Sequence, residues 1–145
     1  MSLAAAQKTL EILDETDALE RIATYGTRLR NGMSAVLKAR GIAHSFVGHP
    51  SMSGLYFAHD PPRNYRDWKG SDYTFYDAAA RVLHDERILC EPDSREPWFV
   101  CAAHDDSCLA DTLRAFEVAI DRTLDTLPGT RRTPDFGLLR GEPAA

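Results

Sequence analysis

The sequence predicts an α+β domain in which a small, mainly antiparallel sheet of three or four strands is covered by helices on one face. The chain has 145 residues, enough for one ordinary domain with its own core. Segments with helical spacing and short runs of aromatic and branched residues follow one another as helix, helix, strand, strand, helix, strand, strand, helix. We therefore expect one small domain over residues 1–127, followed by a mobile tail over residues 128–145 that is too poor in apolar residues to pack.

Two helices are expected at the start of the chain. Leu3, Leu10 and Leu13 recur at helical spacing. Asp17 as N-cap and Glu20 three residues later resemble a capping box, so a second helix should begin there. The apolar stripe of this second helix comprises Leu19, Ile22, Gly26, Leu29, Met33, Val36 and Leu37. Gly41 is expected to end it, and the stripe is read as a face buried against the sheet.

The middle of the chain predicts two strands and a third helix. Residues 42–49 and 52–59 are rich in aromatic and branched side chains and are separated by Pro50-Ser51, which favours two adjacent antiparallel strands. The stretch DPPRNYRDWKG is expected to be a loop. Ser71 or Asp72 should cap a helix that runs to about Asp85.

The stretch ILCEPDSREPWFVC holds two further strand-like runs, residues 88–90 and 98–101, on either side of a long polar loop. Asp105 and Asp106 then suit the N-terminus of a last helix, since carboxylates there cap the backbone and complement the helix dipole. The inner face of that helix would comprise Leu109, Leu113, Phe116, Ile120, Leu124 and Leu127.

The overall charge and composition exclude several functions. A net charge of −5 provides no electrostatic footprint for nucleic acid and disfavours anionic membranes. No apolar run approaches the roughly 20 residues of a membrane span. The three cysteines are odd in number and unpatterned, so we expect reduced thiols and a cytoplasmic protein.

Other patterns suggest chemistry but have simpler explanations. Cys101, His104 and Cys108 approach zinc-finger spacing, but no fourth ligand is evident, and buried thiols with a His near a helix start are favoured. A Cys–His hydrolase lacks a third, orienting group. Lys69 lies in a polar stretch and is expected to be a solvated lysine rather than a reactive amine. No metal site is therefore predicted.

Glu96 is the strongest candidate for a functional side chain. It lies between Arg95 and Pro97, in a loop that Pro92 and Pro97 stiffen. A stiff loop is useful where a side chain must be held in one position. The residues alone leave two possibilities open: a solvated acid in a hairpin loop, or a carboxylate presented to a site whose other half lies elsewhere.

Four segments together resemble the C-terminal part of class III pyridoxal-phosphate (PLP)-dependent enzymes, with the likeness greatest to the glutamate-1-semialdehyde 2,1-aminomutase group. The segments are SLAAAQKTLEIL, GIAHSFVGHPSMSGLYF, RNYRDWKGSD and EPDSREPWFVCAAHDD. The resemblance implies the small domain of a homodimeric fold-type-I aminotransferase or aminomutase. Its large domain, absent from this chain, would hold the cofactor and the Schiff-base lysine, and Met1 would be an internal methionine of a longer enzyme.

The resemblance also implies a role for Glu96. The family places an acid near the substrate amino groups in a segment P-S-x-x-E, which reads Pro92-Asp93-Ser94-Arg95-Glu96 here, with Asp93 in place of the usual Ser. Phe99 and Val100 stand where many class III aminotransferases carry a carboxylate-binding Arg, which leaves the small-molecule substrate open. Lys8, Lys38 and Lys69 do not match the cofactor lysine, so no cofactor-binding residue and no complete catalytic set are expected, and the chain alone should be inactive. The alternative is a stand-alone, non-catalytic α+β interaction or dimerisation module.

Overall fold

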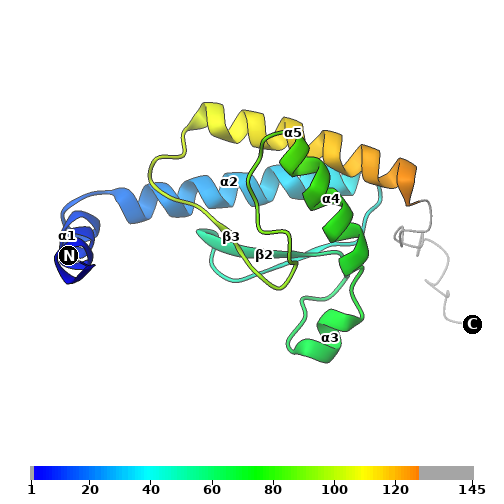
Figure 1. The fold of residues 1–145 in the computed structure, drawn as a ribbon, viewed down its shortest axis with the longest axis horizontal. Helices are drawn as coiled ribbons and strands as arrows, with labels where there is room; N and C mark the ends of the chain where they lie inside the picture. Colours follow the sequence, from blue (N-terminus) through cyan, green and yellow to red (C-terminus); the bar gives the residue numbers. More distant parts are fainter. Residues whose placement is uncertain (1, 128–145) are drawn as a thin grey trace, which may run out of the picture.

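The computed structural model describes residues 2–127 as an α+β arrangement, which confirms the predicted fold class (Figure 1). The helices are α1 (Ser2–Glu15), α2 (Ala18–Ala39), α3 (Tyr65–Lys69), α4 (Tyr73–Asp85) and α5 (Asp106–Thr126). The strands are β1 (Ser45–Val47), β2 (Met52–Tyr56) and β3 (Trp98–Phe99). The tail predicted over residues 128–145 lies outside the described residues.

The three strands form one antiparallel sheet in the order β1-β2-β3. Phe46 lies opposite Leu55, and Ser53 lies opposite Trp98. Figure 1 shows α2 and α5 side by side on one side of this sheet, with α4 crossing α5. The expected pairing of the two middle strands is confirmed, and the chain brings Trp98 beside β2 across the long loop.

The strand expected at residues 88–90 is wrong. Arg87 adopts a left-handed backbone conformation with φ of 66°, and the Ile88 N–H donates to the Leu83 carbonyl oxygen at 2.9 Å, as in a Schellman-type helix end. Leu89 is 95% exposed and Cys90 is buried. These residues therefore complete the end of α4, and the apolar run is too short to distinguish that role from a strand.

The helix ends confirm most of the predicted caps. The carboxylates of Asp72 and Asp105 accept from the backbone N–H groups of Phe75 and Cys108, at 3.0 and 2.9 Å. The capping box expected at Asp17 is wrong, because this side chain makes no capping hydrogen bond, and the Ala18 N–H donates to Thr16 Oγ1 instead. Gly41 follows the end of α2 with φ of 65°, as a C′ glycine does.

The core lies between the sheet and the three long helices α2, α4 and α5. Its largest fully buried side chains are Phe75, Phe116, Leu37, Leu83, Ile120 and Thr123. The predicted inner face of α5 is confirmed at Leu109, Phe116 and Ile120, which are buried. Burying each of the apolar side chains in this set stabilises the domain by about 1.5–3 kcal/mol.

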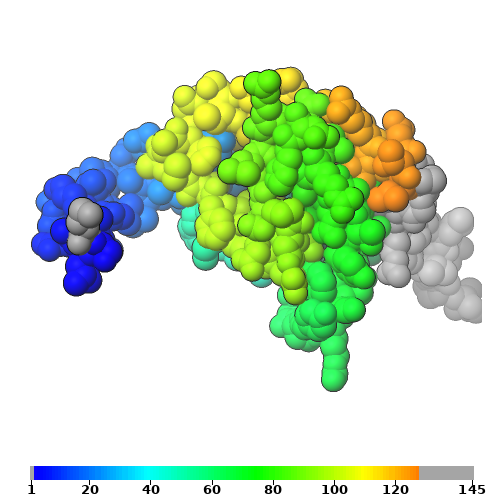
Figure 2. All heavy atoms as spheres, viewed as in Figure 1, coloured from blue at the N-terminus to red at the C-terminus, as the bar shows by residue number. Residues whose placement is uncertain are grey.

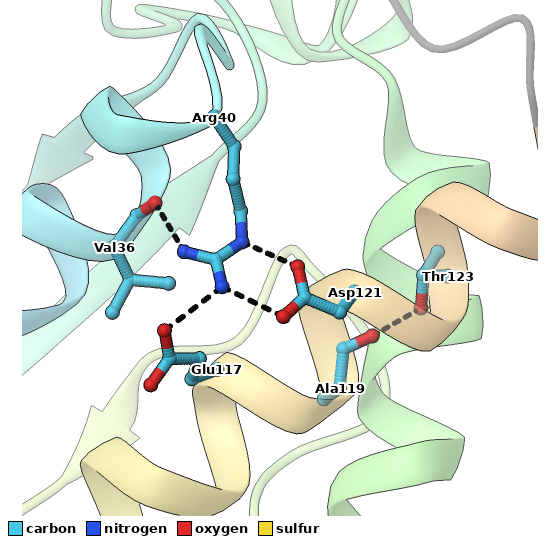
Figure 3. A network of polar contacts seen from close by, with 6 residues as sticks. All are labelled: Val36, Arg40, Glu117, Ala119, Asp121 and Thr123. Atoms are coloured by element: carbon cyan, nitrogen blue, oxygen red, sulfur yellow. Dashed lines mark hydrogen bonds and ion pairs between the residues drawn. The ribbon is translucent and has the colours of Figure 1, made fainter.

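A polar clamp ties the end of α2 to α5 (Figure 3). Arg40 donates from Nε to Asp121 Oδ1 at 2.5 Å, from one terminal nitrogen to Glu117 at 2.9 Å, and from the other to the Val36 carbonyl oxygen at 3.1 Å. These hydrogen bonds, led by the one to Asp121, raise the pKa of Arg40. The arginine thereby joins two helices that are far apart in the sequence.

A close approach between α2 and the β1–β2 turn requires glycine. A Cβ placed on Gly26 would lie 2.1 Å from the Pro50 carbonyl oxygen, a backbone atom. The predicted stripe position at Gly26 is therefore a contact site for the turn, not a gap in the apolar face.

The first helix stands apart from the core, at the left of Figures 1 and 2. None of its residues is buried, and Leu3 and Leu10 are 85% and 68% exposed. Further exposed apolar side chains are Ile12, Leu19, Met52, Leu89 and Phe99. Among residues 2–127, no helix is long and apolar enough to cross a membrane.

Candidate functional site

The loop of residues 90–97 is held in place by three side chains from the body of the domain. The Trp98 indole N–H donates to the Tyr76 hydroxyl at 2.9 Å, and that hydroxyl donates to the Glu91 carbonyl oxygen at 2.9 Å. His84 Nε2 lies 2.7 Å from the Cys90 carbonyl oxygen. The loop is therefore anchored at its beginning and its end to α4 and β3.

A second indole anchors the middle of the loop. The Trp68 Nε1–H donates to Ser94 Oγ at 2.9 Å, and Ser94 is only 2% exposed. Burial raises the pKa of Tyr76, which keeps its hydroxyl protonated and able to donate. Because each buried polar atom in these anchors has a partner, the loop can hold one conformation without an unsatisfied group.

Asp93 and Arg95 form a pair within the loop. Arg95 Nε lies 2.9 Å from Asp93 Oδ1, and one terminal nitrogen bonds Asp93 Oδ2. The hydrogen bonds from Arg95 lower the pKa of Asp93 to about 2, so its carboxylate stays ionised. The guanidinium carbon lies 5.3 Å from the centre of the Trp68 ring, which adds a cation–π contact.

The Glu96 carboxylate is exposed and makes no hydrogen bond or ion pair with any residue that the structure describes. Its backbone N–H donates to the Asp93 carbonyl oxygen at 3.0 Å, which fixes the backbone beneath it. The charge of Glu96 also reaches Tyr56: burial is the main cause that raises the pKa of this tyrosine, and Glu96 and Asp93 add to it. Glu96 is thus a free acid on a fixed backbone.

The loop adjoins an aromatic arm, residues 62–73, that extends below the body of the domain in Figures 1 and 2. The rings of Tyr65, Trp68 and Tyr73 follow one another with centroids 5.2 and 4.9 Å apart. Asn64 caps α3 by accepting from the N–H groups of Arg66 and Asp67. The residues DPPRNYRDWKG were expected to be a loop, and α3 is the correction: a single turn of helix started by an Asn cap that the apolar pattern does not reveal.

Two hollows open on either side of Trp68 and Arg95, which line both. The first, here called the Tyr65 hollow, has a volume of about 230 Å³ and is lined by Tyr56, Pro62, Asn64, Tyr65, Trp68 and Arg95. The second has a volume of about 320 Å³ and is lined by Trp68, Tyr73, Asp77, Pro92, Asp93 and Arg95. Burial, and then the charge of Asp93, raise the pKa of Asp77 in the second hollow.

The structure brings some of the predicted candidates together and leaves others apart. Asp93, Arg95 and Glu96 share the anchored loop, whereas Phe99 is 67% exposed on the last strand. Cys101 Sγ lies 3.3 Å from His104 Nδ1. Within residues 2–127, however, no group of three or more His, Cys, Asp or Glu side chains is suited to hold a metal ion.

Sequence reasoning missed the aromatic side of the site. Tyr56, Tyr65 and Trp68 come from the end of β2 and from α3, and only folding places them beside the loop. Ser94 offered a weak signal, because a small polar residue between charged neighbours is a common hydrogen-bond partner in turns.

Comparisons with known proteins point to one group of enzymes. The chain is 37% identical over 116 residues to a glutamate-1-semialdehyde 2,1-aminomutase of Neisseria gonorrhoeae, a match that covers 78% of this chain and 26% of that protein. It is 32% identical over 115 residues to glutamate-1-semialdehyde 2,1-aminomutase 2 of Brevibacillus brevis, covering 79% of this chain and 27% of the relative. The chain thus spans about a quarter of the length of these relatives. No family model matches it.

Two solved structures resemble this chain over most of its length. The FumI protein of Sphingopyxis sp. MTA144, in its PLP internal aldimine form, matches 90% of this chain and 29% of its own with a TM-score of 0.72 and 27% identity. An omega-transaminase of Sphaerobacter thermophilus matches 72% of this chain and 24% of its own, with a TM-score of 0.59 and 18% identity, which shows the fold alone.

The fold is therefore that of a small α+β domain from PLP-dependent aminotransferases. Within that group the chain is a relative of the glutamate-1-semialdehyde 2,1-aminomutases and corresponds to a part of them.

Among residues 2–127, the three lysines are not placed as a cofactor-binding lysine would be. Lys8 and Lys38 lie on α1 and α2, and Lys69, at the end of α3, is exposed with Nζ 5.9 Å from the centre of the Tyr65 ring. A lysine that binds a cofactor covalently is enclosed beside it, whereas Lys69 is exposed against an aromatic ring. The two hollows beside the loop, of about 230 and 320 Å³, have no lysine among their lining residues.

Proposed function

We propose that this chain is the small domain of a class III PLP-dependent aminotransferase or aminomutase, acting on a small amino acid or aldehyde together with a large cofactor-binding domain. The observation that carries the proposal is Glu96, an uncommitted carboxylate on a loop that three separate contacts hold in place. The similarity to aminomutases over most of the chain supports it.

Glu96 would orient the substrate rather than perform the chemistry. A carboxylate shielded from water forms a charge-assisted hydrogen bond with a substrate ammonium group worth about 1.5–3 kcal/mol. The cofactor, when bound by the large domain, supplies the electron sink for amino-group transfer. The rigid backbone under Glu96 contributes by reducing the entropy lost when the substrate is positioned.

The exposed apolar side chains suit a domain that works inside a larger assembly. Leu3 and Leu10 on α1, and Leu89 and Phe99 beside the loop, are each more than 60% exposed, as expected for surfaces covered by a partner. We assign these surfaces to the large domain and to the second subunit of a homodimer, in the cytoplasm. A chain without the large domain would then bind no cofactor and have no transaminase activity.

A second candidate is a stand-alone interaction or dimerisation module. The exposed leucines of α1 favour it, because such a face can associate with another copy. The two functions differ in what the purified chain does when a PLP-binding large domain is added. Restored cofactor absorbance and turnover support the enzyme; self-association that the large domain does not change supports the module.

Replacing Glu96 by Gln tests the proposed role in the enzyme that carries both domains. Turnover should fall about 10- to 100-fold, since about 1.4 kcal/mol corresponds to a factor of ten, while the cofactor absorbance stays unchanged. Glu91→Gln is the matched control, an exposed acid of the same loop whose carboxylate makes no hydrogen bond or ion pair among the described residues. Unchanged turnover in Glu96→Gln would remove Glu96 from the site.

A further inference from the structure

The Tyr65 hollow has the features of a binding site for a small anion. Its walls are the rings of Tyr56, Tyr65 and Trp68, and Arg95 is its one basic lining residue. Asp93 engages Nε and one terminal nitrogen of Arg95, and no described residue bonds the other terminal nitrogen. A guanidinium has five N–H donors, so this nitrogen can bind a second oxyanion without displacing Asp93.

The pair with Asp93 makes this donor well positioned. The two contacts hold the guanidinium 5.3 Å from the centre of the Trp68 ring, and the Trp68 indole is itself bonded to buried Ser94. Tyr56 lines the same hollow, and its hydroxyl can add a second donor. Little side-chain freedom is therefore lost when an anion binds.

Two cations lie against the aromatic faces beside the hollow. Arg95 already lies over Trp68, and Lys69 lies 5.9 Å from the centre of the Tyr65 ring, so cations occupy these aromatic faces. Residues 62–73 carry three basic side chains, Arg63, Arg66 and Lys69, against two acidic ones, Asp67 and Asp72, in a chain of net charge −5. The arm thus carries one more basic than acidic side chain, in a chain that is acidic as a whole.

We propose that the Tyr65 hollow binds the carboxylate of the substrate, with Arg95 as the specificity-determining residue. This rests on the proposed function and deepens it: the substrate would carry an ammonium group for Glu96 and a carboxylate for Arg95, which adjoin in the sequence. An amine without a carboxylate would be accepted poorly.

The test is a titration of the full 145-residue chain followed by the indole N–H signals of its two tryptophans in NMR spectra. The probes are butyrate, butylamine, 4-aminobutyrate and inorganic phosphate at constant ionic strength. Butyrate should shift the Trp68 indole signal saturably, with a dissociation constant on the order of millimolar, and leave Trp98 unchanged. Arg95→Gln should weaken this binding about tenfold or more.

Arg114→Gln is the matched control, because Arg114 is an exposed arginine paired with Asp111 on α5, away from the hollow; it should bind butyrate as the wild type does. Tyr65→Ala, which removes a wall but no charge, should also weaken binding. Equal butyrate shifts in the wild type and Arg95→Gln, or shifts with butylamine alone, would overturn the proposal. Phosphate binding more than tenfold tighter than butyrate would do so too, by assigning the hollow to a phosphate group.

These outcomes are separate from the test of Glu96. Butyrate binding that depends on Arg95, combined with normal turnover in Glu96→Gln, would keep the anion site and remove the role of Glu96. The reverse pair of results would keep Glu96 and remove the anion site.

Discussion

Arg40 and Arg95 each hold an aspartate with two nitrogens, yet the two pairs have different consequences. Arg40 joins α2 to Asp121, 81 residues later, and its side chain is 18% exposed (Figure 3). Arg95 joins Asp93, two residues earlier, and its side chain is 55% exposed.

The two guanidinium groups differ in how many of their nitrogens are already hydrogen-bonded. The three nitrogens of Arg40 are all engaged, by Asp121, Glu117 and the Val36 carbonyl oxygen. Arg95 uses two nitrogens on Asp93 and keeps the third beside a hollow. A fully used, half-buried arginine stabilises a fold, whereas a partly used, exposed one is available to a ligand.

The helix α2, which Arg40 joins to α5, should also be sensitive to steric clashes in its packing. Gly26→Ala would bring a Cβ to 2.1 Å from the Pro50 carbonyl oxygen, so α2 or the turn must move, at a cost of about 3 kcal/mol in unfolding free energy. Gly32→Ala is the control on the same helix, because its Cβ meets only the movable end of the Leu113 side chain. Urea denaturation measures both, and equal losses would contradict a rigid contact at Gly26.

Removing each arginine tests the comparison directly. Arg40→Met should lower the unfolding free energy by about 1–2 kcal/mol, because it breaks a partly buried network between two helices. Arg95→Met should cost about 0.5 kcal/mol or less, as for other exposed pairs close in sequence. Thermal unfolding of both variants gives the ratio. A larger loss for Arg95→Met would show that the loop pair stabilises the fold.

A smaller effect should appear in the pH dependence of the clamp. The hydrogen bond from Arg40 lowers the folded-state pKa of Asp121 below its usual value of 3.8, so its contribution is present above that pH and is lost as pH falls through the folded-state pKa. Asp121→Asn should therefore cost stability at pH 7, by about 1 kcal/mol at a half-exposed site, and less at pH 3. A difference from the wild type that stays constant between pH 7 and pH 3 would contradict the clamp.

The helices and their caps could be predicted because their causes are local. Asp72 and Asp105 lie three residues before the N–H groups they accept from, and the stripe of α5 follows from its spacing. The strand at residues 88–90 and the cap at Asp17 failed for the opposite reason. The apolar triplet at residues 88–90 and the acids Asp17 and Glu20 are compatible with several local structures. Tertiary packing determines which of these structures forms.

The candidate site also has a part that the sequence predicts and a part that it does not. Glu96 and its stiff loop were visible in the sequence, because prolines and the resemblance of a short motif mark them. The anchors could not be predicted: Trp68 reaches Ser94 across 26 residues, and Trp98 reaches Tyr76 across 22.

The sequence by itself determined the α+β class, the long helices and the carboxylate at residue 96, since periodicity, caps and proline act over a few residues. The tertiary structure alone decided that Arg95 lies over Trp68, that the charge of Glu96 reaches Tyr56, and that a hollow lined by Tyr56, Trp68 and Arg95 opens beside the loop. Hydrogen bonds between side chains far apart in the sequence depend on how the helices and strands pack together. The pattern of neighbouring residues does not contain that information.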